Sequence, residues 1–357
     1  MQPSKANNIL LVQLGFLGDV VLSTPVIGAL RKIYPEAKID FLCTKESSGL
    51  VSNHPELNSV ITYDKRKKER GFLGLLRKVK DLRKNEYDAV FSLHKSYRTA
   101  SLLWLSGIPK RFGFKKSSLN FLYTRTTERP ESSHEVERNL AILKNIDIDP
   151  NIFIEPLRIG INTQLHDQAN ELIKNLPALK IAIAPGSVWR TKRWTKEGFS
   201  KISKELLSSG FGVVLIGGPS DMESGEFIEK SLSEYNFKDR FINTIGKYPL
   251  DYSCALIDAC DALVTNDSAP LHIGSALNKP LVAIFCATVP AQGFGPWMVQ
   301  HQIVERKELG CRPCGSHGGH KCPLGTDACQ KEISPQEVLI ALRSLIDKIK
   351  VNDIAIK

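Results

Sequence analysis

The sequence lacks the long apolar runs that cross membranes and the motifs of several common protein classes. No stretch of eighteen or more uncharged apolar residues occurs in its 357 residues, and its start, MQPSKANNIL, has neither the basic beginning nor the apolar core of a signal peptide. No helix-turn-helix, RNP-type or zinc-finger spacing is present, so no nucleic-acid partner is indicated. We therefore expect a cytoplasmic protein.

A nicotinamide-binding glycine turn is also missing, which argues against a dinucleotide-dependent oxidoreductase. The first apolar stretch runs into Gly15-x-x-Gly18-Asp19 within LVQLGFLGDVVLSTP, and this is not the Gly-x-Gly-x-x-Gly pattern. The junction from strand to helix carries one acid. It is open to three interpretations: a phosphate-binding loop, a helix start that Asp19 stabilises, or a site of chemistry.

What the sequence does contain is a repeated alternation of short apolar strands with helices. A hydrophobic content of 42% and this length predict about two domains, each with its own core. The alternation predicts parallel sheets with helices on both faces, and hence two doubly wound, Rossmann-like α/β domains. A polar, weakly patterned bridge at 146–178 separates the two halves. The expected strands are 7–14, 38–43, 59–64, 88–94, 179–187, 211–218, 241–246, 261–267 and 280–286; the expected helices are 20–34, 74–86, 195–210, 222–235, 251–260, 269–277 and 334–350, the last with Ser334 as N-cap.

The positive charge is concentrated in one segment. Residues 64–116 hold 16 Lys or Arg and five Asp or Glu, a net +11 that accounts for the whole excess of +10 in the chain. The segment is open to two interpretations, solvated helix faces or a surface that meets phosphates in nucleic acid or anionic lipid. Because KRKKERGFLGLLRKVKDLRK interleaves cations with Phe72, Leu73, Leu75, Leu76 and Val79, it is closer to a helix that lies at a membrane interface.

The loop IAPGSVWRTKRW, which follows a predicted strand, suits an anion. Gly186 allows a close backbone approach, Ser187 offers a hydroxyl, and Arg190, Lys192 and Arg193 bring cations to one loop. Charge-assisted hydrogen bonds from such a loop would neutralise a diphosphate as it leaves. The alternative is a surface loop that caps the next helix.

Two further loops follow predicted strands in the second half. In LVTNDSAPLHIGSAL, a helix is expected to begin near Pro270, and free N–H groups at its start would bind an anion. Asp267 is suited to sugar hydroxyls, with N-capping as the competing role, and His272 either contacts phosphate or packs. In VVLIGGPSDMESGE, either Asp221 or Glu223 could accept hydrogen bonds from a ribose.

The eight cysteines fall into two groups. Cys43, Cys254, Cys260 and Cys286 are scattered and are most simply buried thiols. The others form the pattern Cys311-x₂-Cys314-x₇-Cys322-x₆-Cys329. This spacing resembles a structural zinc site, and a reduced thiol cluster and a disulfide are the alternatives.

The order of these motifs resembles glycosyltransferase family nine, the ADP-heptose:lipopolysaccharide heptosyltransferases. The segments that carry the resemblance are LGFLGDVVLSTPVIGALRKIYPEAKIDFL, APGSVWRTKRWTKEGF, VVLIGGPSD, LVTNDSAPLHIGSALNKPLVAIF and CRPCGSHGGHKCPLGTDAC, so it covers residues 8–345. The cysteine-rich segment looks most like the heptosyltransferase II branch.

The resemblance implies a GT-B fold and an inverting sugar transfer. It implies an acceptor-binding domain at 1–170, an ADP-sugar-binding domain at 171–335 and a C-terminal helix at 336–357 that packs back on the first domain. Asp19 would be the general base, and no catalytic metal or other cofactor would be needed. For the donor, ADP-heptose, the resemblance implies that Asp267 holds heptose hydroxyls and Glu223 the ribose, with Asp221 as the alternative. The diphosphate would be held by Ser187, Lys192, Ser268, Ala269, Pro270, Leu271 and His272.

The resemblance also implies a lipid-linked acceptor. The partner would be the lipopolysaccharide core on lipid A, so we expect peripheral contact with the cytoplasmic face of the inner membrane through the basic segment. Gly18, Arg98 and a turn at KRFGF (110–114) are the expected acceptor-side residues. A family member that uses another nucleotide sugar or another core acceptor is the alternative function.

Overall fold

A computed structural model of the chain describes residues 6–65 and 69–355, with side chains up to residue 348. Residues 66–68 of the basic segment, 1–5 of the expected first domain and 356–357 of the expected C-terminal helix lie outside the described residues. The chain forms two compact units, Met1–Gly160 and Ile161–Lys357. The sequence placed this division between residues 170 and 171, and the roles given to the two domains stay a proposal.

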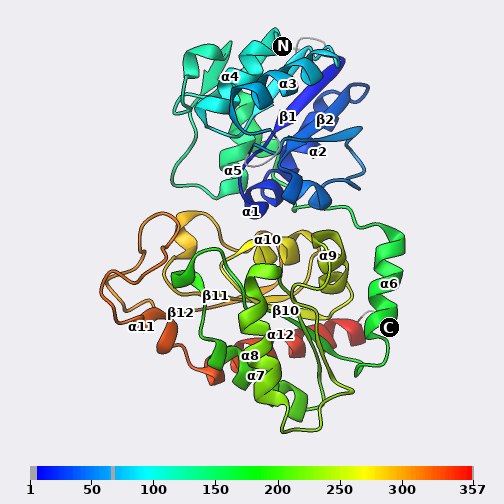
Figure 1. Cartoon of the computed structure of the whole chain (residues 1–357), viewed down its shortest axis with the longest axis vertical. Helices are drawn as coiled ribbons and strands as arrows, with labels where there is room; N and C mark the ends of the chain where they lie inside the picture. Colours follow the sequence, from blue (N-terminus) through cyan, green and yellow to red (C-terminus); the bar gives the residue numbers. More distant parts are fainter. Residues whose placement is uncertain (1–5, 66–68, 356–357) are drawn as a thin grey trace. The chain divides into compact units, whose positions relative to one another are not determined.

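The first unit is built on one parallel sheet of six strands in the order β3-β2-β1-β4-β5-β6 (Figure 1). Buried aliphatic side chains fill the strands next to the centre, as in the run Leu10, Leu11 and Val12 of β1. The strands are β1 Asn8–Val12, β2 Lys38–Cys43, β3 Ser59–Thr62, β4 Ala89–Ser92, β5 Lys110–Phe114 and β6 Arg125–Thr127; the helices are α1 Leu17–Val21, α2 Thr24–Ile33, α3 Gly71–Arg83, α4 Tyr97–Leu105 and α5 Glu135–Leu140.

The second unit repeats the arrangement with the order β12-β11-β10-β7-β8-β9, again all parallel. Its strands are β7 Lys180–Ala184, β8 Gly212–Leu215, β9 Phe241–Asn243, β10 Ala262–Asn266, β11 Leu281–Phe285 and β12 His301–Glu305. Its helices are α6 Thr163–Ile173, α7 Lys196–Ser208, α8 Met222–Leu232, α9 Leu250–Asp258, α10 Ala269–Ala276, α11 Ala328–Lys331 and α12 Pro335–Ala355.

The two sheets have the same topology. In each sheet the first strand of the chain lies in the middle, the next two strands lie on one side of it, and the last three lie on the other side. This is the doubly wound Rossmann order. The predicted fold class is therefore confirmed. The strand order reverses between β1 and β4 in the first unit and between β7 and β10 in the second, and ligands of such sheets bind beside the carboxyl ends of the strands at this point.

The predicted turn at KRFGF is wrong, because this segment is the strand β5. It pairs in parallel with β4 and β6, and Phe112 and Phe114 are buried in the sheet. Strands β6 and β12 and helices α4 and α6 were not predicted either, and α6 lies within the segment that was interpreted as a bridge. These elements are short or weakly patterned in sequence.

The predicted helix at 20–34 is divided in two. Helix α1 ends at Val21 and α2 starts at Thr24; Leu22 and Ser23 form a turn between them, and Pro25 lies in the first positions of α2. Proline lacks the N–H that would continue the hydrogen bonds of α1, and its ring opposes an unbroken helix. The division leaves α1 as little more than one turn directly after β1, and this turn carries Asp19.

The C-terminal helix α12 begins as predicted at Ser334. The Ser334 side chain accepts a hydrogen bond from the Glu337 N–H at 3.3 Å, and the Glu337 carboxylate accepts from the Ser334 N–H at 2.8 Å. This reciprocal pair is a capping box. The helix contacts β12, β11 and α7 of its own unit; the predicted packing on the first domain stays a prediction.

Replacing the cap should destabilise the second unit measurably. We expect Ser334→Ala to lower the free energy of unfolding by about 1 kcal/mol, since it removes the acceptor for a helix N–H. Ser344→Ala makes the same chemical change inside α12 and should be neutral or slightly stabilising because alanine has the higher helix propensity. Urea unfolding followed by circular dichroism measures both; equal losses in the two variants would contradict the capping role.

Candidate active site

In the first unit, a carboxylate and an ammonium group lie in the segments that follow two neighbouring strands, where the strand order reverses. Asp19 lies in α1 after β1, and Lys95 lies in the loop after β4, the strand that neighbours β1. The predicted acceptor-side residue Gly18 lies half-buried in α1 next to Asp19. Its contact with an acceptor stays a prediction.

The Asp19 carboxylate is folded back over the glycine turn before it. Its Oδ2 accepts a hydrogen bond from the Phe16 N–H at 2.8 Å. A Cβ atom at position 15 would lie only 2.4 Å from that oxygen, so Gly15 is required there for space. Gly15 therefore makes room for the Asp19 carboxylate, and the sequence motif does not need to be a phosphate loop.

The surroundings raise the pKa of Asp19 to about 6. Burial is the largest cause, and the negative charge of Glu135 adds to it; the Phe16 N–H, Arg129 and Lys95 act in the opposite direction. An aspartate with this pKa is mostly ionised at neutral pH and is a stronger base than an ordinary aspartate. It is thus suited to take a proton from a hydroxyl group.

Glu135 belongs to a buried ion group that sequence reasoning missed. Its carboxylate pairs with the Arg129 guanidinium, and its other oxygen lies 3.4 Å from Nη1 of Arg138. Glu135 and Arg138 are both buried. A usable sequence signal was present, because charged residues stand among apolar ones in HEVERNLAIL (134–143), which begins seven residues after the last strand of the first sheet.

Lys95 faces the same ion group. Burial and the nearby Arg129 and Arg138 lower the pKa of its ammonium, while Glu135 raises it. Its neighbour His94 donates to or accepts from the Thr99 hydroxyl at 2.7 Å, and burial with the charge of Lys65 lowers the pKa of His94 to about 4. His94 is therefore uncharged at neutral pH, and the positive charges that act on Asp19 are those of Arg129 and Lys95.

Arg98, the other predicted acceptor-side residue, is occupied within the protein. Its Nε donates to the Tyr63 hydroxyl at 2.7 Å, and its Nη2 donates to the carbonyls of Glu69 and Gly71, each at 2.8 Å. These bonds tie the start of α4 to the turn that precedes α3. The structure thus gives Arg98 a role in holding that turn, and acceptor binding by Arg98 stays a prediction.

In the second unit, Lys192 and Asp267 come together from two loops at the reversal of strand order. The Lys192 Nζ lies 2.6 Å from Oδ2 of Asp267, and the same oxygen accepts a hydrogen bond from the Thr288 hydroxyl at 2.6 Å. Asp267 is buried and Lys192 nearly so. Thr288, at the end of β11, was not predicted from the sequence.

The residues after β10 form a helix start in which Asp267 is not the cap. Ser268 occupies the N-cap position without a side-chain cap bond, and Pro270 lies in the first positions of α10. The competing N-cap role of Asp267 is therefore wrong. Leu271 and His272 are buried, so from Ser268 to His272 it is chiefly the backbone around Ser268, Ala269 and Pro270 that is open to a ligand.

Asn266, at the end of β10, joins the loop after β7 to the end of β10. The Trp194 N–H donates to Oδ1 of Asn266 at 2.9 Å, and the Asn266 amide donates to the Pro185 carbonyl at 2.8 Å. Ser187 is buried, and its carbonyl accepts from Arg193 at 2.7 Å. Because Asn266 is fully buried, these bonds fix the loop that carries Lys192 against the end of β10.

Asp221 and Glu223 differ sharply in placement. Asp221 accepts from the Gly218 N–H at 3.0 Å and lies so close to Gly186 that a Cβ there would meet its carboxyl group at 2.3 Å. Burial raises the pKa of Asp221, and the Gly218 N–H and Arg193 oppose this. The Glu223 side chain is 88% exposed and lies 3.1 Å from Nζ of Lys196.

The cysteine-rich segment holds the loop after β7 from the other side. The Thr191 N–H donates to the Gly319 carbonyl at 3.0 Å, the Gly319 N–H returns a bond to the Thr191 hydroxyl at 2.8 Å, and Arg190 pairs with Asp327 at 2.8 Å. The rings of Trp189 and His320 are 4.9 Å apart.

The four clustered cysteines are close enough to affect one another. Burial raises the pKa of Cys329 to about 11, and the charges of Cys314, Cys311 and Cys322 act on it. All eight cysteines are free thiols, so the disulfide alternative is not adopted. Within residues 6–65 and 69–355, no group of three or more His, Cys, Asp or Glu side chains is arranged to hold a metal ion.

Comparisons with known proteins agree on one family. The model for "Glycosyltransferase family 9 (heptosyltransferase)" matches residues 75–321. Lipopolysaccharide heptosyltransferase 2 of Escherichia coli is 28% identical over 95% of this chain and 98% of its own length. Lipooligosaccharide heptosyltransferase 2 of Haemophilus ducreyi is 30% identical over 79% of this chain and 84% of its own.

Solved structures give the same result. A family 9 glycosyltransferase from Veillonella parvula has a TM-score of 0.81 at 24% identity, over 98% of this chain and 99% of that one. The E. coli ADP-heptose lipopolysaccharide heptosyltransferase II has a TM-score of 0.78 at 26% identity, over 96% of this chain and 99% of that one. No helix in the described part of the chain is long and apolar enough to cross a membrane.

The raised pKa of Asp19 leads to a test that needs no substrate. A carbon NMR titration of labelled aspartate carboxyl groups should contain one resonance, absent in Asp19→Asn, that titrates near pH 6. Glu135→Gln should move this pKa down, since a nearby negative charge is removed, and Arg129→Gln should move it up, since a nearby positive charge is removed. Shifts in the same direction, or none, would contradict the role of the ion group, because structural damage alone would not produce opposite signs.

Proposed function

The chain belongs to glycosyltransferase family 9, and on that premise we propose that it transfers heptose from ADP-heptose to the inner core of lipopolysaccharide with inversion at the anomeric carbon. The two Rossmann-like units are those of a GT-B glycosyltransferase. The observation that carries the proposal is the half-buried carboxylate of Asp19, which a glycine turn holds at the reversal of strand order and whose pKa is raised to about 6.

In the proposed reaction, Asp19 acts as the general base. Its carboxylate takes the proton from a hydroxyl of the acceptor sugar, and the oxygen forms a bond to the anomeric carbon of heptose. The bond from that carbon to the β-phosphate oxygen of ADP breaks on the opposite face, and the electron pair leaves with the diphosphate. Asp19 ends the step protonated, and Arg129 and Lys95 supply positive charge that favours its return to the ionised form.

The second unit is the proposed donor site. Lys192 and the open backbone at the start of α10, around Ser268, Ala269 and Pro270, would neutralise the diphosphate. Ser187 would add a contact from the loop after β7. We propose that Asp267 then exchanges its ion pair with Lys192 for heptose hydroxyls, while Thr288 keeps its carboxylate oriented. Charge is neutralised by the protein itself, so the proposal needs no catalytic metal or other cofactor.

For the ribose we propose Glu223. Its exposed carboxylate pairs with Lys196, its one ion-pair partner among the described residues, and it lies at the start of α8 beside the loop after β8. Asp221 is already used in shaping that loop against Gly186. Asp221 is therefore the poorer ligand and the more structural of the two acids.

We propose a structural role for the cysteine-rich segment. It holds the loop that carries Lys192 through Thr191, Arg190 and their partners, and a bound zinc ion or reduced thiols are the two alternatives for its core. The thiols as they stand do not form a metal site, so no step of the reaction is assigned to one. Metal analysis of protein purified without chelators distinguishes the alternatives.

The acceptor core is linked to lipid A, so we also propose that the enzyme works at the cytoplasmic face of the inner membrane as a peripheral protein. The net charge of +11 in residues 64–116 supports this, since anionic headgroups attract such segments.

Removing the base should abolish turnover and spare donor binding. We expect Asp19→Asn to lower kcat by about 10²- to 10⁴-fold, because the amide cannot accept the proton. The dissociation constant for ADP-heptose, measured by calorimetry, should stay within about two-fold. Asp147→Asn is the matched control, since Asp147 is an exposed carboxylate of the same unit paired with Arg125. Loss of donor affinity with transfer preserved would contradict the assignment.

The donor is identified by comparing nucleotide sugars in a thermal-shift assay. ADP-heptose should raise the melting temperature more than UDP-glucose, GDP-mannose or ADP-glucose at equal concentration, because only a ligand of the folded state stabilises it. Lys192→Met should remove most of the shift, and Lys201→Met, an exposed lysine of α7, should leave it unchanged. A larger shift with another nucleotide sugar would favour a family member with a different donor.

A further inference from the structure

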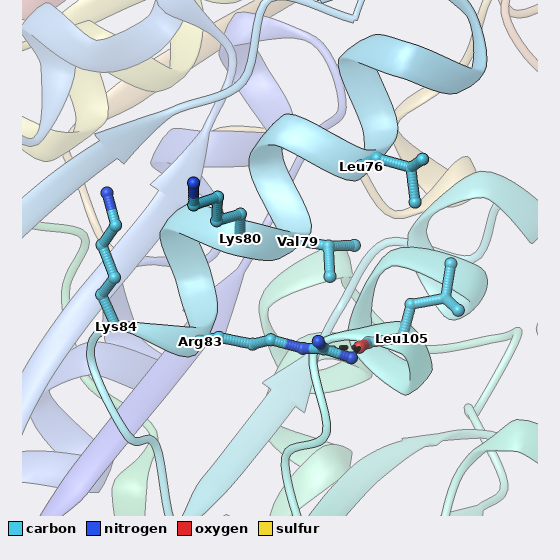
Figure 2. A pocket seen from close by; sticks show the side chains of 6 residues that line it. All are labelled: Leu76, Val79, Lys80, Arg83, Lys84 and Leu105. Carbon is cyan, nitrogen blue, oxygen red and sulfur yellow. Dashed lines mark hydrogen bonds between the residues drawn. The ribbon is translucent and has the colours of Figure 1, made fainter.

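A surface groove lies between α3 and α4, away from the residues assigned to the reaction. It has a volume of about 550 Å³ and is lined by Leu76, Val79, Lys80, Arg83, Lys84 and Leu105 (Figure 2). We refer to these six residues as the α3–α4 groove. Its size falls within the range of small-ligand pockets, about 300–1,000 Å³. The groove is open to solvent and combines an apolar wall with a cationic one.

The apolar wall continues onto exposed side chains nearby. Phe72 and Leu73 of α3 precede Leu76 by four and three residues, which places them on the same helix face one turn earlier. They are 67% and 68% exposed, and Trp104 of the adjoining α4 is 52% exposed. Large apolar side chains gathered on two packed helices in this way indicate an interaction surface.

The cationic wall comes from the last two turns of α3. The Arg83 guanidinium reaches across to α4 and donates to the Leu105 carbonyl at 2.8 and 3.2 Å, so it is held over the groove (Figure 2). Lys80 and Lys84 extend beside each other from the same helix (Figure 2). Among the described residues, Asp81 is the one carboxylate that pairs with these cations, at 3.5 Å from Lys84.

One lysine of α3, Lys78, points into the fold and differs from the exposed lysines of the groove. Lys78 is buried, donates to the Thr62 carbonyl at 2.7 Å and lies 3.0 Å from Glu69, so its charge is used inside the fold. Lys80 and Lys84, two and six residues after Lys78, are exposed to solvent. The helix therefore separates a structural cation from a set of cations that is available to a partner.

We propose that the α3–α4 groove docks the enzyme on an anionic phospholipid bilayer, with lipid phosphates against Lys80, Arg83 and Lys84 and with Phe72, Leu73 and Trp104 among the acyl chains. This rests on the proposed function in that the acceptor is a membrane lipid. Basic residues beside Trp, Phe and Leu are the composition of helices that lie in the membrane interface. Nucleic acid fits less well, since its phosphates need the cations and leave the aliphatic side chains Leu73 and Leu76 without a partner.

Flotation of the full-length protein with vesicles tests the charged part. The wild type should bind vesicles that contain phosphatidylglycerol, bind phosphatidylcholine vesicles much less, and lose affinity as salt is raised. Each cation near an anionic surface contributes roughly five-fold, so Lys80→Glu combined with Lys84→Glu should weaken binding by at least about ten-fold. The matched control, Lys201→Glu with Lys230→Glu, reverses two exposed lysines on α7 and α8 and should bind as the wild type does.

The apolar part is tested by Leu73→Ser combined with Trp104→Ser. This variant should retain the salt dependence and lose affinity at every salt concentration, because apolar insertion is not screened. Equal binding of both groove variants and the wild type would overturn the proposal, as would equal binding of the wild type to neutral vesicles. Tighter binding to a DNA duplex than to anionic vesicles, lost in the lysine variant, would overturn it in favour of nucleic acid.

Transfer to an acyl-free core oligosaccharide separates this inference from the proposed function. Both groove variants should transfer heptose to this soluble acceptor at the wild-type rate, and should be slowed only when the acceptor is embedded in vesicles. A wild type that binds vesicles through the groove and transfers no heptose would contradict the proposed function alone. Groove variants slowed equally on the soluble acceptor would show that the groove serves the fold or the acceptor site, and would overturn the docking role.

Discussion

The parallel pairing of every strand in the two sheets is the constraint on which the site depends. When all strands run in one direction, their carboxyl ends lie at the same edge of the sheet. Where the strand order reverses, the loops after two neighbouring strands turn to opposite sides of the sheet and leave a crevice between them. In the first unit this brings α1 with Asp19 next to the loop of Lys95. In the second unit it brings the loop of Lys192 next to Asp267, whose carboxylate closes an ion pair with it at 2.6 Å. Residues far apart in sequence thus meet because of topology.

The fold was largely readable from the sequence because buried parallel strands are continuous apolar runs. Stretches such as NNILLVQL and LKIAIA carry no competing pattern, and the ends of β1 and β7 were predicted to within two and three residues. The segment KRFGF was misjudged because two cations and a glycine outweighed Phe112 and Phe114, the side chains that are buried in β5. Short strands at the sheet edges bury too few residues to leave a clear signal.

The parts of the candidate site that depend on contacts between residues close in sequence could be predicted. The parts that depend on charges brought together by tertiary packing could not. Gly15 and Asp19 are four residues apart, so the close contact between them is local. Arg129 and Glu135 act on Asp19 from more than a hundred residues away, and no local pattern links them to α1. Thr288 escaped notice for the same reason, since a lone threonine after a strand becomes meaningful only when Asp267 is seen beside it.

The bonds between the cysteine-rich segment and the loop after β7 affect the order in which the protein folds during translation. The bonds from Thr191 to Gly319 and from Arg190 to Asp327 join residues 128 and 137 positions apart. During synthesis from the N-terminus, the strands of the second sheet can pair as they emerge, yet the loop that carries Lys192 lacks its partners until the ribosome has released residues near the end of the chain. In the nascent chain the turn of Asp19 is therefore complete long before the loop of Lys192, which gains its last partners only as translation closes.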